Sequence, residues 1–148
     1  MKVMVWGIGN DLNGDDGVGP YVARRLREMG MDAHDCGTVP ENCLGYVRRE
    51  RPDILIMVDA ASMGLPPGSV RRVSLKGMVN TTYTTHAIPI RMMQTLLQRY
   101  AGEILVVGVE PESTEFGTPL SDSVKEAAER VVQIISQGRW NEIPPLEG

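Results

Sequence analysis

Three short apolar runs recur at wide intervals along the chain. They cover residues 3–6 (VMVW), 54–58 (ILIMV) and 103–109 (EILVVGV). Runs that are this short and almost free of polar residues are typical of strands with both faces buried. The pattern therefore predicts three central strands of a sheet that is covered on both sides.

Between these runs, apolar residues recur every three or four positions, as they do on one face of a helix. The stripes comprise Val18, Val22, Leu26 and Met29; Leu44 and Val47; Ile88, Met92, Leu96 and Tyr100; and Val124, Ala128, Val131 and Ile135. Residues that favour helix starts accompany them, namely Asp15 or Asp16, Asn42, Pro89 and Ser121. Because strand and helix signals alternate, we predict an α/β domain with a mostly parallel sheet.

Two more strands and a tail complete the predicted organisation. Residues 31–35 (MDAHD) supply a further strand, and residues 68–75 (GSVRRVSL) follow a turn-rich segment without room for a crossover helix. The latter is therefore predicted as an antiparallel or edge strand. We expect residues 1–138 to form the domain, and residues 139–148, which end in NEIPPLEG, to form a loose C-terminal tail.

Size and charge narrow the classes of partner. A chain of 148 residues with 42% hydrophobic residues suits a single domain. Its formal net charge is −4 and it has no cluster of Lys or Arg, so no nucleic-acid partner is expected. No apolar run reaches the ~18 residues of a transmembrane helix, and the apolar N-terminal segment is too short for a secretory signal. We expect a soluble, cytoplasmic protein without membrane insertion.

The two cysteines give no motif. Cys36 and Cys43 are separated by six residues, which fits neither a C-x-x-C redox motif nor a zinc knuckle. Two cysteines also make a poor disulfide framework, and a cytoplasmic protein keeps its thiols reduced. The sequence therefore predicts free thiols.

Residues 7–19 (GIGNDLNGDDGVG) form a glycine-rich segment directly after the first apolar run. Two of its glycines have the spacing of a phosphate-binding loop, but Asp15 and Asp16 occupy the positions of the loop's Lys and Ser/Thr. A dinucleotide fingerprint needs a third glycine where this chain has Leu12, and the acids would repel a pyrophosphate. No nucleotide cofactor is therefore expected.

A cation is the better candidate ligand for this segment. An EF-hand loop that starts at Asp11 fails where glycine is required, at Asp16, and where Glu is required, at Val22. What remains is a turn that presents carboxylates at the mouth of a parallel sheet. The alternative is that Asp15 and Asp16 only cap the following helix and complement its dipole. The residues alone leave both interpretations open.

Two further residues are candidates for the same site. Asp59 ends the run ILIMVD, and the carboxyl ends of strands line the ligand crevice of an open α/β sheet, although a cap of the next turn is the alternative. His86 precedes a helix in TTYTTHAIP, whereas His34 lies inside a predicted strand and is assigned a structural role. Two carboxylates and an imidazole suit a borderline divalent metal with open coordination positions, but spacing does not show that they converge.

Four blocks, taken in order, resemble the hydrogenase maturation endopeptidases, in particular the branch that serves the formate-hydrogenlyase hydrogenase. They are GIGNDLNGDDGVG, DCGTVPEN, ILIMVDAASMGLPPG and TTYTTHAIP, and the resemblance runs from Lys2 to Gln137. Proteases of this family trim the C-terminal extension from the large subunit of nickel-iron hydrogenases. The resemblance implies a three-layer α/β/α fold with a twisted, mostly parallel sheet of about five strands.

The resemblance also implies roles for particular residues. The metal-binding acids of the family fall on Asp16 and Asp59, and its histidine falls on His86. The implied metal is nickel carried by the precursor, which acts as a recognition element for cleavage after nickel insertion. The implied partner is the large-subunit precursor, and a monomer is expected for a small domain that docks on it.

One block departs from the family pattern. The family commonly has Asp-Gly-Gly followed by Thr or Ser, whereas this chain has Asp35, Cys36, Gly37 and Thr38. Asp35 is a second-tier candidate for the site, and Cys36 is not assigned as a nucleophile. Hydrolysis by activated water is expected instead, because a divalent ion can activate water and stabilise an oxyanion. A non-catalytic nickel-binding assembly chaperone is the alternative function, and a nucleotide-binding switch is the third.

Overall fold

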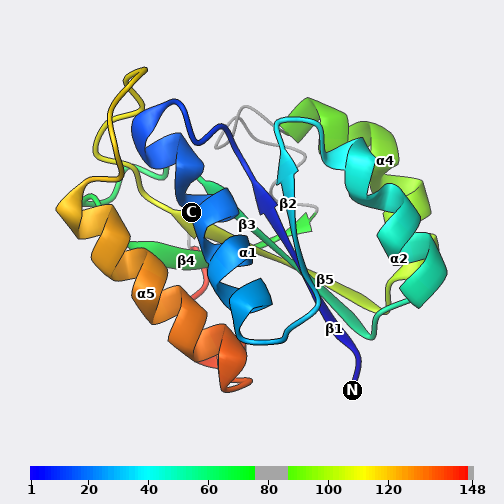
Figure 1. Ribbon diagram of the computed structural model, residues 1–148. Helices are drawn as coiled ribbons and strands as arrows, with labels where there is room; N and C mark the ends of the chain where they lie inside the picture. Colours follow the sequence, from blue (N-terminus) through cyan, green and yellow to red (C-terminus); the bar gives the residue numbers. More distant parts are fainter. Residues whose placement is uncertain (76–86, 147–148) are drawn as a thin grey trace.

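The computed structural model describes residues 1–75 and 87–146. One five-stranded sheet lies between two layers of helices (Figure 1), so the predicted three-layer α/β fold is confirmed. The strands are β1 (Val3–Ile8), β2 (Ala33–Gly37), β3 (Ile54–Ala60), β4 (Val70–Ser74) and β5 (Glu103–Val109). The helices are α1 (Val18–Glu28), α2 (Leu44–Glu50), α4 (Ala87–Tyr100) and α5 (Asp122–Ser136), with 3₁₀ helices η1 (Gly14–Gly17), η2 (Pro40–Cys43) and η3 (Trp140–Glu142).

The sheet has its most apolar strands at the centre. The sheet has the order β2-β1-β3-β5-β4, in which β1, β2, β3 and β5 run parallel and β4 pairs antiparallel with β5. The three apolar runs form the three central strands, and every residue of β3 is buried. The segment predicted as an antiparallel or edge strand is the edge strand β4, while β2 lies slightly C-terminal to its predicted position.

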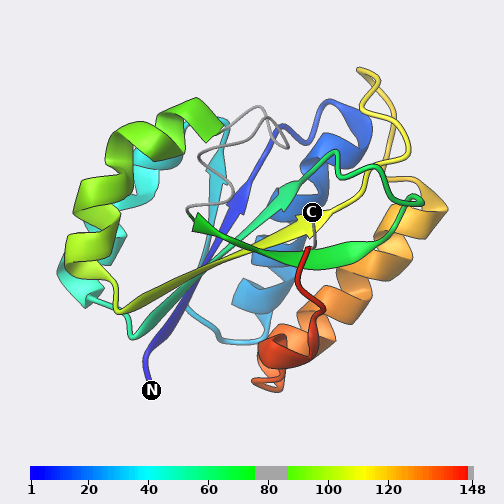
Figure 2. The same cartoon turned by 180° about the vertical axis from the view of Figure 1, so that it is seen from behind.

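Alternate residues of the strands enter two separate cores, one on each face of the sheet. In β1, Val5 packs with α1 and α5 residues such as Val22 and Val131, whereas Trp6 packs with α2 and α4 residues. Figures 1 and 2 show these two helical pairs on opposite faces of the sheet. The stripes predicted for α1, α2 and α5 face these cores, apart from Met29 at the end of α1, which is 47% exposed. The stripe predicted for α4 is wrong, since Met92 and Leu96 are 82% and 39% exposed. This helix buries Ile90, Met93 and Leu97 instead, because it has apolar residues on more than one face and only one face packs on the sheet. None of the helices within the described ranges is long and apolar enough to cross a membrane.

A polar cluster joins the two helices that cover one face. Arg25 on α1 donates from Nε and Nη2 to the carboxylate of Glu129 on α5, both at 3.1 Å, and Tyr21 Oη also donates to Glu129. The hydrogen bond from Arg25, followed by that from Tyr21, lowers the pKa of Glu129. The hydrogen bond to Glu129 raises the pKa of Tyr21 and that of Arg25. These shifts show that the cluster favours a charged Arg25–Glu129 pair and a protonated Tyr21.

The C-terminal residues pack along β4. The backbone N–H of Arg72 donates to Pro144 O at 2.8 Å, and Leu146 N–H donates to Arg72 O at 2.9 Å. Ile143 is 2% exposed. The prediction of a loose tail is therefore wrong for residues 139–146. This segment is ordered because it forms hydrogen bonds with backbone groups on the outer edge of β4 that would otherwise be unpaired. The domain boundary at residue 138 stays a prediction.

Cys36 and Cys43 form a disulfide, with their Cα atoms 5.9 Å apart. Cys36 lies in β2 and Cys43 ends η2, and both are buried in the core under α2 and α4. The prediction of free thiols is wrong because it used motif spacing. Bond formation depends instead on how close the folded chain brings the two Cα atoms, and here the chain turns back between them.

Candidate active site

The carboxyl ends of β1, β3 and β5 meet at one edge of the sheet, in the upper part of Figure 1. In open α/β sheets this edge is where ligands bind. Asp59 lies near the end of β3 and is 1% exposed, and Asp16 lies half-buried in η1, which follows β1. Because η1 contacts β3, these two predicted site residues lie on adjoining segments of the edge.

Close packing explains two glycines of the segment that joins β1 to α1. A Cβ at Gly19 would lie 2.4 Å from Ile8 O and 2.3 Å from Val58 O, so only glycine lets α1 begin against β1 and β3. Gly9 has a φ of +145°, and a Cβ there would lie 1.9 Å from Asp16 O. The glycines thus bring η1 onto the sheet edge and do not indicate a phosphate site.

Asp16 uses only part of its carboxylate inside the fold. The backbone N–H of Asn10 donates to Asp16 Oδ2 at 3.0 Å. Within residues 1–75 and 87–146, no donor is bonded to Asp16 Oδ1. As far as the described residues go, that oxygen is open to a cation or to a water molecule at the carboxyl edge.

Asp15, the adjacent acid, is fully buried and has a different task. Its carboxylate accepts hydrogen bonds from the backbone N–H groups of Glu112, Ser113 and Ser121 at 2.9, 3.0 and 2.7 Å. Ser121 Oγ donates to it as well, at 2.8 Å. Neither η1 nor α1 has a side-chain cap, so the capping interpretation is replaced for Asp15 by a long-range one. Asp15 joins η1 to the loop between β5 and α5.

The third predicted site residue, His86, lies outside the described residues. Within the ranges that are described, no group of three or more His, Cys, Asp or Glu residues could hold a metal ion. The assignment of Asp16, Asp59 and His86 as one metal-binding and catalytic set therefore stays a prediction. The contacts of His34 fit a structural role. Its ring stacks on that of Tyr46, with the ring centroids 3.9 Å apart, and its Nε2 lies 2.8 Å from Asp32 Oδ1.

Asp35, the second-tier candidate, takes part in an ion pair at the end of β2. Arg24 Nη1 on α1 lies 3.1 Å from Asp35 Oδ2 and 3.3 Å from Asp11 Oδ2. Asp35 Oδ1 also accepts a hydrogen bond from Gly37 N–H at 3.0 Å. These contacts give Asp35 a role in shaping the loop after β2, next to the disulfide.

Glu110 is a residue of this edge that the sequence analysis missed. It follows β5, is 8% exposed, and accepts hydrogen bonds at Oε1 from Met63 N–H at 2.7 Å and Leu65 N–H at 3.1 Å. The loop after Asp59 is thereby fixed to the end of β5. The available signal was a Glu directly after the strand run EILVVGV, at the same carboxyl edge at which Asp59 lies near the end of β3.

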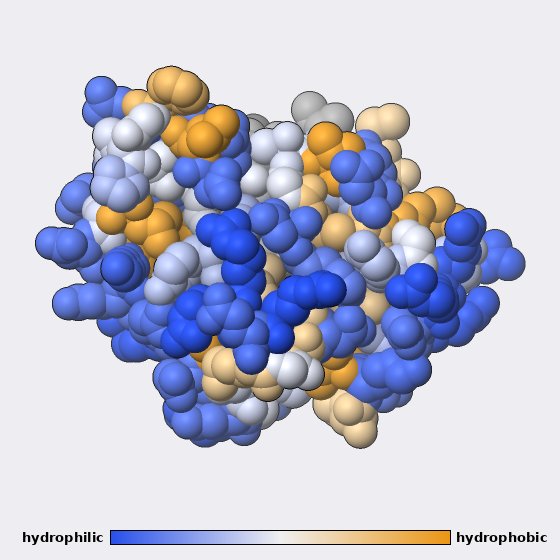
Figure 3. Space-filling model, in the orientation of Figure 1, coloured by the Kyte–Doolittle hydropathy of each residue, from blue (hydrophilic) through white to orange (hydrophobic). Residues whose placement is uncertain are grey.

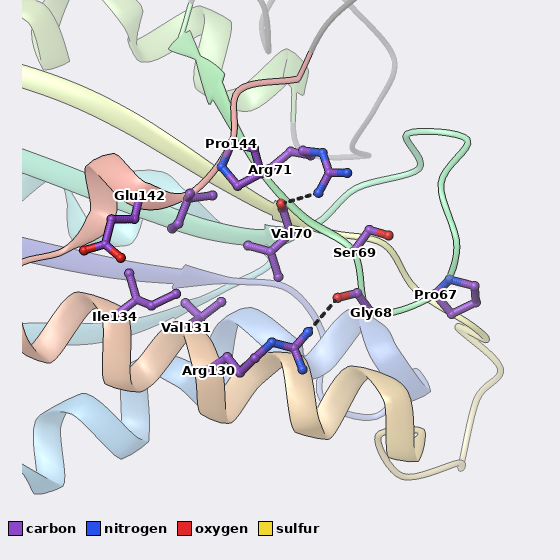
Figure 4. A pocket seen from close by; sticks show the side chains of 11 residues that line it. Pro67, Gly68, Ser69, Val70, Arg71, Arg130, Val131, Ile134, Glu142 and Pro144 are labelled. Atoms are coloured by element: carbon purple, nitrogen blue, oxygen red, sulfur yellow. Dashed lines mark hydrogen bonds between the residues drawn. The ribbon is translucent and has the colours of Figure 1, made fainter.

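A pocket elsewhere on the surface has a different character (Figure 4). It has a volume of about 400 Å³ and lies between β4, α5 and the C-terminal segment. Its two arginines donate to the backbone of its own walls, Arg130 Nη2 to Gly68 O at 3.2 Å and Arg71 Nη1 to Val70 O at 2.8 Å. It contains neither Asp16 nor Asp59, and we assign it no catalytic role.

Comparisons with known proteins identify the family of the chain and agree with its fold. The family described as hydrogenase maturation protease, HycI, matches residues 20–138. The hydrogenase 3 maturation protease of Escherichia coli K12 is 33% identical over 130 residues, which cover 85% of this chain and 83% of that protein.

Two solved structures share the whole fold. The solution structure of the endopeptidase HycI from Escherichia coli has a TM-score of 0.89 at 30% identity and covers 99% of this chain and 97% of its own. The crystal structure of the nickel-iron hydrogenase maturation protease HycI from Thermococcus kodakarensis has a TM-score of 0.83 at 30% identity, with coverages of 93% and 92%. The chain therefore belongs to the hydrogenase maturation proteases, a family of endopeptidases.

Proposed function

We propose that this protease removes the C-terminal extension of the large-subunit precursor of a nickel-iron hydrogenase after nickel has been inserted. Family membership supplies the reaction class. The observation that carries the proposal is the difference in hydrogen bonding between the neighbouring acids Asp15 and Asp16. Asp15 accepts four hydrogen bonds inside the fold. Asp16, on the segment that adjoins Asp59, accepts one from the part of the chain that the structure describes, which leaves Oδ1 without a donor there.

In this proposal nickel belongs to the precursor and is recognised by Asp16, Asp59 and His86. Carboxylate and imidazole groups hold a divalent ion while leaving positions for ligands from the substrate. Bound there, nickel orients or polarises the carbonyl of the scissile bond. Cleavage would then report that the precursor has been loaded.

The attacking group in the proposal is a water molecule. The chain has two cysteines, and both are joined in the disulfide, so neither supplies the thiolate of a cysteine protease. Asp16 and Asp59 are the carboxylates that we assign to accept the proton of that water. The carbonyl carbon then gains an oxygen, and the leaving amine takes up a proton as the peptide bond breaks.

The proposal is tested by incubating the purified protein with a nickel-loaded precursor and with the same precursor without nickel. The mass of the precursor's C-terminal region is the measurement. We expect loss of a short C-terminal peptide from the loaded form only. Cleavage of both forms would remove nickel as the recognition element, and nickel binding without any cleavage would favour the assembly chaperone.

Single substitutions test the three assigned side chains. Asp16→Asn, Asp59→Asn and His86→Ala are each expected to abolish cleavage of the loaded precursor. Asp53→Asn is the matched control, because Asp53 accepts a hydrogen bond from Lys2 N–H at the opposite edge of the sheet. Full processing by any of the three site variants would refute the role of that residue.

A further inference from the structure

Two large apolar side chains are exposed near the carboxyl edge. Phe116 is 76% exposed in the loop between β5 and α5, and Leu12 is 60% exposed in the turn after β1. In Figure 3 apolar surface gathers at the upper left, where Figure 1 places this loop and the start of α1. Single exposed apolar residues are ordinary, but two on segments that are joined by a backbone hydrogen bond form a candidate contact surface.

The two loops are joined and internally ordered. Gly117 N–H, next to Phe116, donates to Leu12 O at 2.8 Å. Inside the longer loop, Thr118 Oγ1 donates to Glu115 O at 2.7 Å. Both ends of that loop are also held by the buried carboxylate of Asp15. Side chains carried on ordered backbone lose less conformational entropy on binding than those on a mobile loop.

This surface adjoins the assigned site through the chain itself. Leu12 lies in the same turn as Asp16, and Asp15 ties the turn to the loop that carries Phe116. A polypeptide that presents a peptide bond to Asp16 extends beyond that bond, and it therefore passes over adjoining residues. The polypeptide whose bond is cleaved is therefore the partner that would reach Leu12 and Phe116.

The charge of the surface specifies the chemistry of that partner. Residues 111–120 (PESTEFGTPL) contain Glu112 and Glu115, both exposed, and no Lys or Arg. A complementary segment offers an apolar pocket for the Phe116 ring and basic side chains around it, since opposite charges across an interface favour the encounter.

We propose that Leu12 and Phe116 form a docking surface for the hydrogenase large-subunit precursor, which contacts it through an apolar and basic segment next to the cleavage site. This inference rests on the proposed function and adds to it a determinant of substrate binding. Phe116 and Leu12 have apolar side chains that take no part in the chemical step, so they contribute to KM and not to kcat.

The test measures cleavage of the nickel-loaded precursor and, separately, the Kd for the nickel-free precursor. Phe116→Ala is expected to raise both KM and Kd about tenfold, as truncation of an aromatic anchor does, with kcat unchanged. Phe116→Tyr keeps the ring and should stay within about twofold of the wild type by the same reasoning. Met29→Ala is the control, since Met29 is 47% exposed at the end of α1, towards the opposite edge.

The outcomes separate this inference from the proposed function. A Phe116→Ala variant that matches the wild type in KM and Kd overturns the docking surface while cleavage stands. If the wild type binds the precursor but does not cleave it, the proposed function fails and the Kd values of the variants still decide the docking surface. If the wild type binds no precursor, both are overturned.

A charge reversal tests the chemistry of the partner. Glu112→Lys combined with Glu115→Lys is expected to weaken precursor binding and to reduce its dependence on ionic strength. Tighter binding by this variant would contradict a basic segment on the precursor. Both side chains are exposed, so the variant's unfolding midpoint should match that of the wild type.

Discussion

The turn after β1 and the loop after β2 end neighbouring parallel strands, and they are held by opposite means. The first is fixed by a buried carboxylate, Asp15, which receives backbone hydrogen bonds from a loop about a hundred residues away in sequence. The second is fixed by the Cys36–Cys43 disulfide and by the exposed ion pair of Arg24 with Asp35. The contrast shows that the chain orders one side of its site by polar burial and the other by a covalent bond.

The largest expected effect comes from removing the buried carboxylate. Asp15→Ala leaves three backbone N–H groups unsatisfied, each of which costs ~1–3 kcal/mol, so a loss of about 3 kcal/mol or more in the free energy of unfolding is expected. Urea denaturation measures it. Asp16→Ala removes one hydrogen bond within the described ranges, at a half-buried site, and serves as the matched control. Equal losses for the two variants would break the distinction between these acids.

Reduction of the disulfide should have the next largest effect. The disulfide closes a short loop, with a sequence separation of 7, and its loss is expected to cost about 2 kcal/mol. The measurement is urea unfolding with and without dithiothreitol. A Cys36→Ala and Cys43→Ala double variant should be insensitive to dithiothreitol, and an unchanged wild type under reduction would show that the disulfide does not hold the loop.

The ion pair that links the two loops should contribute less than either. Arg24, Asp11 and Asp35 have side chains that are 47%, 54% and 37% exposed, and exposed pairs contribute at most ~1 kcal/mol. Arg24→Ala is therefore expected to change stability by less than this amount. High salt should also lower the free energy of unfolding of the wild type, because it screens this ion pair, and should leave that of the variant unchanged.

The Arg25–Glu129 pair lies outside both loops and should leave them unchanged. The pKa of Glu129 is lowered in the folded protein, so its contribution is present above its ordinary value of 4.5 and is lost as pH falls through the folded-state pKa. Glu129→Gln should remove this part of the acid sensitivity without altering cleavage at neutral pH. An unfolding titration from neutral to acid pH checks the first expectation, and the cleavage rate checks the second.

Periodicity predicted the fold because the three central strands are apolar on both faces, as the complete burial of residues 54–58 requires of a strand between two helical layers. It could not predict the disulfide, because the approach of Cys36 to Cys43 depends on the turn through η2. Periodicity also failed to predict that the C-terminal segment is ordered, because this short, polar and proline-rich sequence has no helix or strand pattern. That segment is ordered by the open edge of β4, a partner that exists only after folding.

Contacts that exist only after folding also limited what could be predicted about the site. The chemistry of the residues selected the pair Asp15 and Asp16 but could not separate a helix cap from a ligand. The role of Asp15 is decided by its hydrogen bonds from Ser121, which contacts η1 only in the folded chain. Glu110 was missed for a related reason, since its partners Met63 and Leu65 offer backbone N–H groups that leave no trace in the sequence.

The most direct test compares the two adjacent acids on one substrate. Asp16→Asn and Asp15→Asn are incubated with the nickel-loaded precursor, and the C-terminal mass is followed while the unfolding midpoint of each variant is recorded. We expect Asp16→Asn to abolish cleavage at an unchanged unfolding midpoint, and Asp15→Asn to lower the midpoint but to cleave while it is folded. Cleavage by Asp16→Asn at the wild-type rate would contradict this expectation.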